Sequence, residues 1–138
     1  MKSAVFYSRW GSLEQREGSG VQAEQHLLQA TNLDLGYAPA HEKLGDVYFE
    51  RGTFDQAGRQ YAIAAGLVPA RAAELYTRSG TAFEEQGDRG RAAEMFEHAL
   101  RARPGYDAAE AGLERLRAPA RAPDQVKMFA PLNPSSGR

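Results

Sequence analysis

A pair of glycines separated by six residues occurs three times in this chain, at a nearly constant interval. The three stretches are "GSLEQREG" from Gly11 to Gly18, "GDVYFERG" from Gly45 to Gly52 and "GTAFEEQG" from Gly80 to Gly87. Their first glycines lie 34 and then 35 positions apart, at 11, 45 and 80. A period of this length indicates a repeat architecture, in which each unit packs on its neighbours.

Other positions keep the same period, and they give each unit a helical pattern. Apolar residues three and four positions apart, such as Leu44, Val47 and Tyr48, share one face of a helix. No segment reads as a strand. The chain is therefore predicted to be all-α, with two helices per unit joined by a tight turn. The positions that recur in register are Ala23, Ala57 and Ala92, then Leu27, Tyr61 and Phe96, then Ala30, Ala64 and Ala99, and finally Leu35, Pro69 and Pro104.

The two glycines of each pair have different expected roles. The first glycine is expected to face the other helix of the same hairpin, with small alanines opposite, because a missing side chain lets two backbones approach. The second glycine is expected at the C-terminal end of the first helix, where a left-handed residue is favoured. Both roles are structural.

These residues resemble the tetratricopeptide repeat, a helix–turn–helix unit of about 34 residues with small, aromatic and proline residues at fixed spacing. The first unit is degenerate, with Glu14 where an aromatic residue is expected and Leu35 in place of proline. The second unit carries His41, Leu44, Gly45, Tyr48, Ala57, Tyr61, Ala64 and Pro69. The third carries Tyr76, Ser79, Gly80, Phe83, Ala92, Phe96, Ala99 and Pro104.

The resemblance implies a right-handed solenoid of three hairpins over residues 4–106, with units at 4–36, 38–71 and 73–106. An apolar stripe after Asp107, a plausible N-cap, predicts a capping helix over residues 107–118. Residues 119–138 are rich in proline and are expected to form an extended or disordered tail, within which "VKMFAPL" is notably apolar.

Composition narrows the class of function. The net charge is -1, from 17 Lys and Arg against 18 Asp and Glu, and non-specific nucleic-acid binding usually requires a basic excess. The chain has no cysteine, which excludes disulfides, thiol nucleophiles and zinc–thiolate sites. No apolar run of signal-peptide or membrane-span length appears. We expect a cytoplasmic protein that binds neither nucleic acid nor membrane.

Neither a cofactor site nor a catalytic site is expected. The two glycines of each pair are too far apart for a phosphate loop, and no nucleophile motif is present. "HEKLG" begins like a zinc-binding HExxH motif, but Gly45 stands where the second histidine is needed, and His26 and His98 lie in different units. The chain is therefore predicted to be no enzyme, with no cofactor and no metal.

The remaining candidate site is a groove. In the family that the repeats resemble, the first helices of successive units line a concave surface that holds a peptide or a partner's helix. By register, the resemblance places on this surface Val5, Ser8, Ser12, Glu42, Lys43, Asp46, Phe49, Glu50, Glu74, Thr77, Arg78, Thr81, Glu84 and Glu85. Most of those in the second and third units are acids, so the groove is predicted to be acidic, with Phe49 as an apolar anchor for a basic or amphipathic segment.

Some members of the family clamp the C-terminal carboxylate of heat-shock chaperones with Lys and Asn on the first helices. The corresponding residues here are Ser8, Ser12, Lys43, Glu74 and Arg78. Only Arg78 fits and Glu74 opposes that pattern, so this clamp is not expected.

The predicted function is therefore that of a protein-interaction adaptor or assembly scaffold. Two alternatives remain open at this point. The chain could be a self-assembling structural protomer whose C-terminal tail docks on a neighbour, with a homo-oligomer as the result. It could also be a small chaperone for a secreted or assembled protein.

Overall fold

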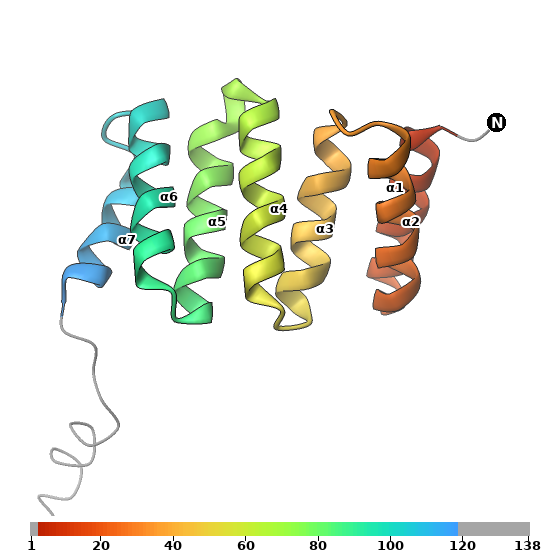
Figure 1. The fold of residues 1–138 in the computed structure, drawn as a ribbon, viewed down its shortest axis with the longest axis horizontal. Helices are drawn as coiled ribbons and strands as arrows, with labels where there is room; N and C mark the ends of the chain where they lie inside the picture. Colours follow the sequence, from red (N-terminus) through yellow and green to blue (C-terminus); the bar gives the residue numbers. More distant parts are fainter. Residues whose placement is uncertain (1–2, 119–138) are drawn as a thin grey trace, which may run out of the picture.

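The computed structural model describes residues 3–118, which form seven α-helices, one short 3-10 helix and no strand. The prediction of an all-α fold is thus confirmed. The helices stand side by side in one row, with α1 and α2 at one end and α7 at the other (Figure 1). They are α1 (Ala4–Arg16), α2 (Gly20–Leu33), α3 (Ala38–Glu50), α4 (Phe54–Leu67), the 3-10 helix η1 (Pro69–Arg71), α5 (Ala72–Gln86), α6 (Arg89–Ala102) and α7 (Asp107–Arg117).

Consecutive helices pack as antiparallel hairpins, α1 with α2, α3 with α4 and α5 with α6. Each hairpin also packs on the next, through α2 against α3 and α4 against α5. Tight turns close the hairpins. In the second hairpin Gly52 has a φ of 80°, a left-handed conformation that glycine adopts without steric cost. The second glycines of the other two pairs do the same, as predicted.

The first glycine of each pair faces a large side chain in the second helix of its hairpin, which corrects one expectation. A Cβ atom on Gly45 would lie 2.7 Å from the Tyr61 ring, and one on Gly80 would lie 2.7 Å from the Phe96 ring. Alanines were expected opposite. The ring lies there instead, because the space left by the missing side chain is filled by the large residue at the third recurring position.

The contact between the second and third hairpins is equally close. A Cβ on Gly58 would lie 2.8 Å from the Phe83 ring, and the buried Ser79 hydroxyl donates a hydrogen bond of 2.7 Å to the Gly58 carbonyl oxygen. Ser79 stands where the second repeat has Leu44. Its hydroxyl is satisfied by the neighbouring backbone, which is how a polar group is tolerated in a core.

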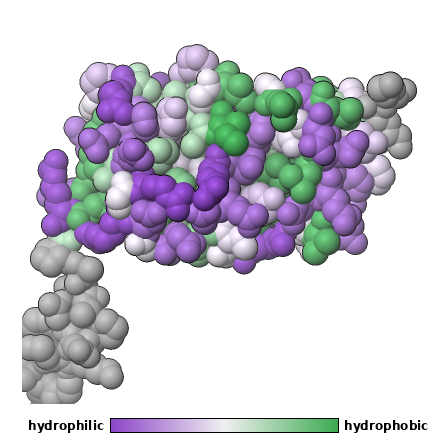
Figure 2. Space-filling view, in the orientation of Figure 1, coloured by the Kyte–Doolittle hydropathy of each residue, from purple (hydrophilic) through white to green (hydrophobic). Residues whose placement is uncertain are grey.

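At the C-terminal end, α7 lays Ala109 and Gly112 against α6. Asp107 was expected as the N-cap but is the first residue of the helix, and Tyr106 is the N-cap. The predicted tail at residues 119–138 lies outside the described residues. None of the helices in residues 3–118 combines the length and apolar character that crossing a bilayer requires. On the face seen in Figure 2, apolar patches lie among polar side chains over the first hairpin.

The glycine–ring contact makes a testable prediction about stability. Gly45→Ala should destabilise the protein by about 1–3 kcal/mol, because the added methyl group overpacks against the Tyr61 ring. The matched control is Gly66→Ala in α4, where nothing lies within 4 Å of the new methyl group. That change should stabilise by about 0.5–1 kcal/mol through helix propensity. Chemical denaturation measures both, and equal effects would contradict the glycine–ring argument.

Candidate functional site

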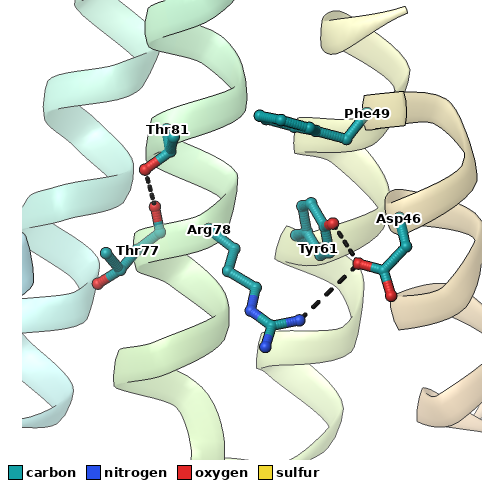
Figure 3. A pocket seen from close by; sticks show the side chains of 6 residues that line it. All are labelled: Asp46, Phe49, Tyr61, Thr77, Arg78 and Thr81. Atoms are coloured by element: carbon teal, nitrogen blue, oxygen red, sulfur yellow. Dashed lines mark hydrogen bonds and ion pairs between the residues drawn. The ribbon is translucent and has the colours of Figure 1, made fainter. Parts of the chain in front are cut away.

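An open pocket lies between α3 and α5, on the face that the repeat register predicted. It holds about 280 Å³ and is lined by side chains from α3, α4 and α5 (Figure 3). Five of its lining residues belong to the predicted groove. The lining residues are Asp46, Phe49, Tyr61, Thr77, Arg78 and Thr81.

Two aromatic rings give the pocket its apolar wall. Phe49, on α3, is half-buried against the core and packs edge-to-face on Phe54 at a centroid distance of 5.0 Å. Tyr61 reaches the pocket from α4, with its ring beneath Gly45. The methyl groups of two threonines complete the opposite side, and each hydroxyl donates to a backbone carbonyl of α5, from Thr77 to Ala73 and from Thr81 to Thr77. The wall therefore offers apolar surface with its hydroxyl donors already used.

Asp46 and Arg78 are the charged residues among those that line the pocket. The Asp46 Oδ1 atom accepts a hydrogen bond from the Tyr61 hydroxyl and lies 3.8 Å from the Arg78 Nη1 atom (Figure 3). Burial raises the pKa of the Asp46 carboxyl, although the hydrogen bond from Tyr61 opposes the shift. The pKa of Tyr61 is strongly raised by burial and by the same carboxylate. Asp46 is thus a partly desolvated acceptor.

Beside the pocket, two arginines and two glutamates form one ion-pair network. Arg71, at the end of η1, binds Glu42 with both Nη atoms, at 2.7 and 2.9 Å. Arg71 Nη2 also lies 3.0 Å from Glu74. Arg78 donates to Glu42 at 3.0 Å and to Glu74 at 2.9 Å. The network links α3 to η1 and α5 through two-pronged guanidinium contacts, the stronger geometry for such pairs.

The network shifts the pKa of its members. The pKa of Glu42 is lowered, mainly by its hydrogen bonds with Arg71, against a desolvation effect of opposite sign. The pKa of Glu74 is lowered by the same guanidinium group, and that of Arg71 is raised. Glu42, Glu74 and Asp46 thus carry three negative charges, and Arg71, Arg78 and Lys43 carry three positive ones, since Lys43 also lowers the pKa of Glu42. The charges of this part of the groove therefore balance.

The other acids of the predicted groove lie farther from the pocket. Glu84 pairs with Arg115 of α7 at 2.9 Å. Glu50 accepts a hydrogen bond from Gln15 at 3.2 Å and is exposed, as is Glu85. Lys43 is half-buried on α3. Glu84 is therefore held in an ion pair, whereas Glu50 and Glu85 present exposed carboxylates on this face.

The first repeat contributes less than its register implied. Ser8 is 1% exposed, so its side chain does not face an open groove. Ser12 is half-buried, and its hydroxyl donates to the Ser8 carbonyl oxygen at 2.8 Å. The pocket lies between the second and third repeats.

The histidines have packing roles. His41 is 6% exposed, with Nδ1 at 2.8 Å from the Gln60 Oε1 atom and Nε2 at 2.9 Å from the Leu35 carbonyl oxygen. His26 contacts Glu14 and stacks on Trp10 at 3.8 Å. Within residues 3–118, no three His, Asp or Glu side chains are grouped so that they could hold a metal ion.

Sequence reasoning missed two residues of this site. Tyr61 was assigned to the core, which is correct for its ring, but its hydroxyl extends to Asp46. Arg71 is the last residue of the second predicted unit, a position to which the repeat pattern assigns no role. The signal for Tyr61 is that the third repeat has Phe96 at the same position, so the extra hydroxyl of Tyr61 requires a polar partner.

The Glu42 network makes a prediction about pH. Glu42→Gln should lower the free energy of unfolding by about 0.5–1 kcal/mol near neutral pH, a modest value because Arg71 and Arg78 are each 41% exposed and screened by solvent. Since the folded-state pKa of Glu42 lies below its ordinary value of 4.5, the contribution is present above that value. It is lost as the pH falls through the folded-state pKa.

Urea denaturation of the native chain and of Glu42→Gln over a range of pH measures the difference in their free energies of unfolding. Glu114→Gln is the matched control, because the pair that it breaks with Arg117 is about three-quarters exposed on both sides and should contribute little. A loss from Glu42→Gln that stays constant into acid would point to packing rather than charge.

Comparison with known proteins supports the fold described above. No protein-family model matches the chain, and no curated protein matches its sequence. Among solved structures, the N-terminal domain of stress-induced protein-1 from C. elegans superposes with a TM-score of 0.74 at 20% identity, over 83% of this chain and 94% of that one. The second TPR domain of human RPAP3, solved with an HSP70 peptide, gives 0.71 at 21% identity, over 84% and 96%.

A structure of MamA protein is more similar in sequence, at 31% identity with a TM-score of 0.66. The match covers 72% of this chain and 54% of that one. The repeats registered in the sequence, the stacked hairpins and these superpositions together identify residues 3–118 as a tetratricopeptide-repeat domain.

Proposed function

We propose that this chain is a protein-interaction adaptor that holds a segment of a partner protein along the groove between α3 and α5. The observation that carries the proposal is the open pocket with aromatic and threonine walls at the centre of this groove. Two of the solved tetratricopeptide-repeat neighbours contain a bound peptide, namely RPAP3 with an HSP70 peptide and Spaghetti with an HSP90 peptide. The proposed activity is binding, without bond chemistry.

The pocket suits one apolar side chain of the partner. Its size, about 280 Å³, is small for a drug-sized ligand but adequate for a leucine, methionine or phenylalanine. Phe49 and Tyr61 would contact that side chain directly. Because the threonine hydroxyls already have backbone partners, an apolar group there leaves no new unsatisfied donor.

The charges favour a partner segment with basic residues near its apolar anchor. The charges of the Arg71–Arg78 network balance once Lys43 is counted, and Glu50 and Glu85 add exposed carboxylates along the same face. Complementary charge steers association and rejects like-charged partners. The peptides in the two neighbours, SGPTIEEVD and SRMEEVD, both end in acidic residues, which Glu42 and Glu74 would oppose here. The proposed ligand is therefore of a different class.

Peptide selection tests this proposal. A random peptide display library panned on the immobilised chain should enrich sequences with an apolar residue flanked by Lys or Arg. Phe49→Ala should weaken the best peptide at least about tenfold in calorimetry, because truncating an interface hot spot typically costs about 2 kcal/mol or more and tenfold corresponds to about 1.4 kcal/mol. Ile63→Ala, on the exposed part of α4, is the matched control and should not change binding.

The peptide SRMEEVD serves as a probe of the charge argument and should bind more weakly than the selected peptides. Preferential enrichment of acidic peptides, or selected peptides that bind Phe49→Ala as well as the native chain, would refute the proposed site.

A further inference from the structure

Helix α1 presents a row of large apolar side chains on the outer end of the solenoid. Phe6, Trp10 and Leu13 are 41%, 38% and 50% exposed, and they border an open hollow of about 600 Å³. They belong to α1, and the first hairpin forms one end of the row of helices (Figure 1). A contiguous apolar patch of this kind on a solvated surface marks an interaction site more often than a chance cluster.

The repeat register explains why this face is apolar. The residues equivalent to Phe6, Trp10 and Leu13 in the second and third repeats are almost completely buried, because they pack on the second helix of the preceding hairpin. Ser79, for example, bonds to Gly58 of α4, and Ala40 packs with Ala30 of α2. The equivalent residues are Ala40, Leu44 and Val47 in α3 and Leu75, Ser79 and Ala82 in α5, each 0–1% exposed.

The opposite end of the solenoid is built differently. Helix α7 turns its small residues Ala109 and Gly112 towards α6 and carries exposed Glu110 and Glu114 on other faces. A polar outer face is the usual property of a capping helix in a repeat stack. Helix α1 therefore carries apolar residues at the positions that α3 and α5 bury against a preceding hairpin, although α1 lies at the end of the described structure.

The spacing on α1 points to what covers it. Five residues lie on one face at intervals of three and four, namely Ser3, Phe6, Trp10, Leu13 and Glu17, which is the spacing of a helix-pairing seam. Trp10 is at the centre, and Ser3 and Glu17 lie seven positions on either side. We propose that a second copy of the chain docks here, with its own α1 antiparallel, so that Trp10 meets the partner's Trp10 and Phe6 meets the partner's Leu13.

Charge selects the antiparallel orientation. Ser3 is the N-cap of α1 and bonds the Phe6 amide, and Glu17 follows the last residue of the same helix. In the antiparallel pair, Glu17 lies beside the N-terminal end of the partner helix, where the helix dipole favours a carboxylate. A parallel pair would set Glu17 against the partner's Glu17. The symmetric arrangement is isologous, which is the commonest geometry of small homo-oligomers.

The association is expected to be weak and reversible. The seam is one helix wide, and the exposed Arg9, next to the central Trp10, comes near its own symmetry mate at one edge. Such a narrow interface belongs to the small size class that is typical of transient complexes. The inference does not depend on the groove between α3 and α5, so either proposal can stand without the other.

Trp10 supplies a direct readout, because it is the only tryptophan of the chain. In sedimentation velocity, the full chain should pass from monomer to dimer between about 1 μM and about 1 mM, a range suited to weak interfaces. Over the same range the Trp10 emission should shift to the blue as its exposed face is covered.

Leu13→Glu should abolish both changes, with helicity by circular dichroism retained, since Leu13 is half exposed in the monomer. Ile63→Glu in α4 is the matched control and should dimerise like the native chain. The orientation is tested by the double variant Phe6→Lys with Leu13→Glu. Its new ammonium and carboxylate groups face each other in an antiparallel pair, so it should recover at least part of the association that either single change removes.

Three results would overturn the proposal: a monomer at every concentration, association that survives Leu13→Glu, or a double variant no better than the single ones. In the first of these cases, a Trp10 emission that is blue-shifted at all concentrations would indicate that another part of the same chain covers the seam.

Discussion

The contact between a glycine and a ring inside each of the second and third hairpins is the constraint on which the rest of this structure depends. Gly45 and Gly80 leave room for the Tyr61 and Phe96 rings, and a methyl group on either glycine would lie 2.7 Å from the ring. This separation determines how closely the two helices of a hairpin approach. Because α3 and α5 each bury one face in this way, their other faces are held side by side and together form the groove.

Tyr61 connects this packing to the candidate site. Its ring fills the space beneath Gly45, while its hydroxyl bonds Asp46 at the edge of the pocket. A side chain with both tasks has little freedom to rotate, so the aromatic wall of the pocket is already in place before a partner arrives. Pre-formed walls reduce the entropy that binding must overcome. The pocket is thus a consequence of hairpin packing, with the hydroxyl as its one specific addition.

The sequence predicted what depends on spacing and missed what depends on side-chain length. Registered glycines, alanines and prolines were sufficient for the helical hairpins, for the left-handed turn at Gly52 and for the place of Phe49 and Arg78 on one face. Spacing gives the direction of a side chain but not its reach. It therefore could not show that Arg71, outside the repeat pattern, extends to Glu42, or that the Gly45 gap receives Tyr61 instead of an alanine. Ser8 has the register of a groove residue but is buried.

The arginine network bears on how the groove should be understood. A half-exposed ion pair contributes little net stability, so Arg71 and Arg78 matter more for position than for energy. By holding Glu42 and Glu74 together, they join α3 to the start of α5 and keep two like charges from separating the helices. They also hold the carboxylates in fixed places, so that charges which balance one another lie beside an apolar pocket. Such a groove distinguishes partners mainly by one apolar side chain of the partner and the charges next to it. The total charge of the partner matters less.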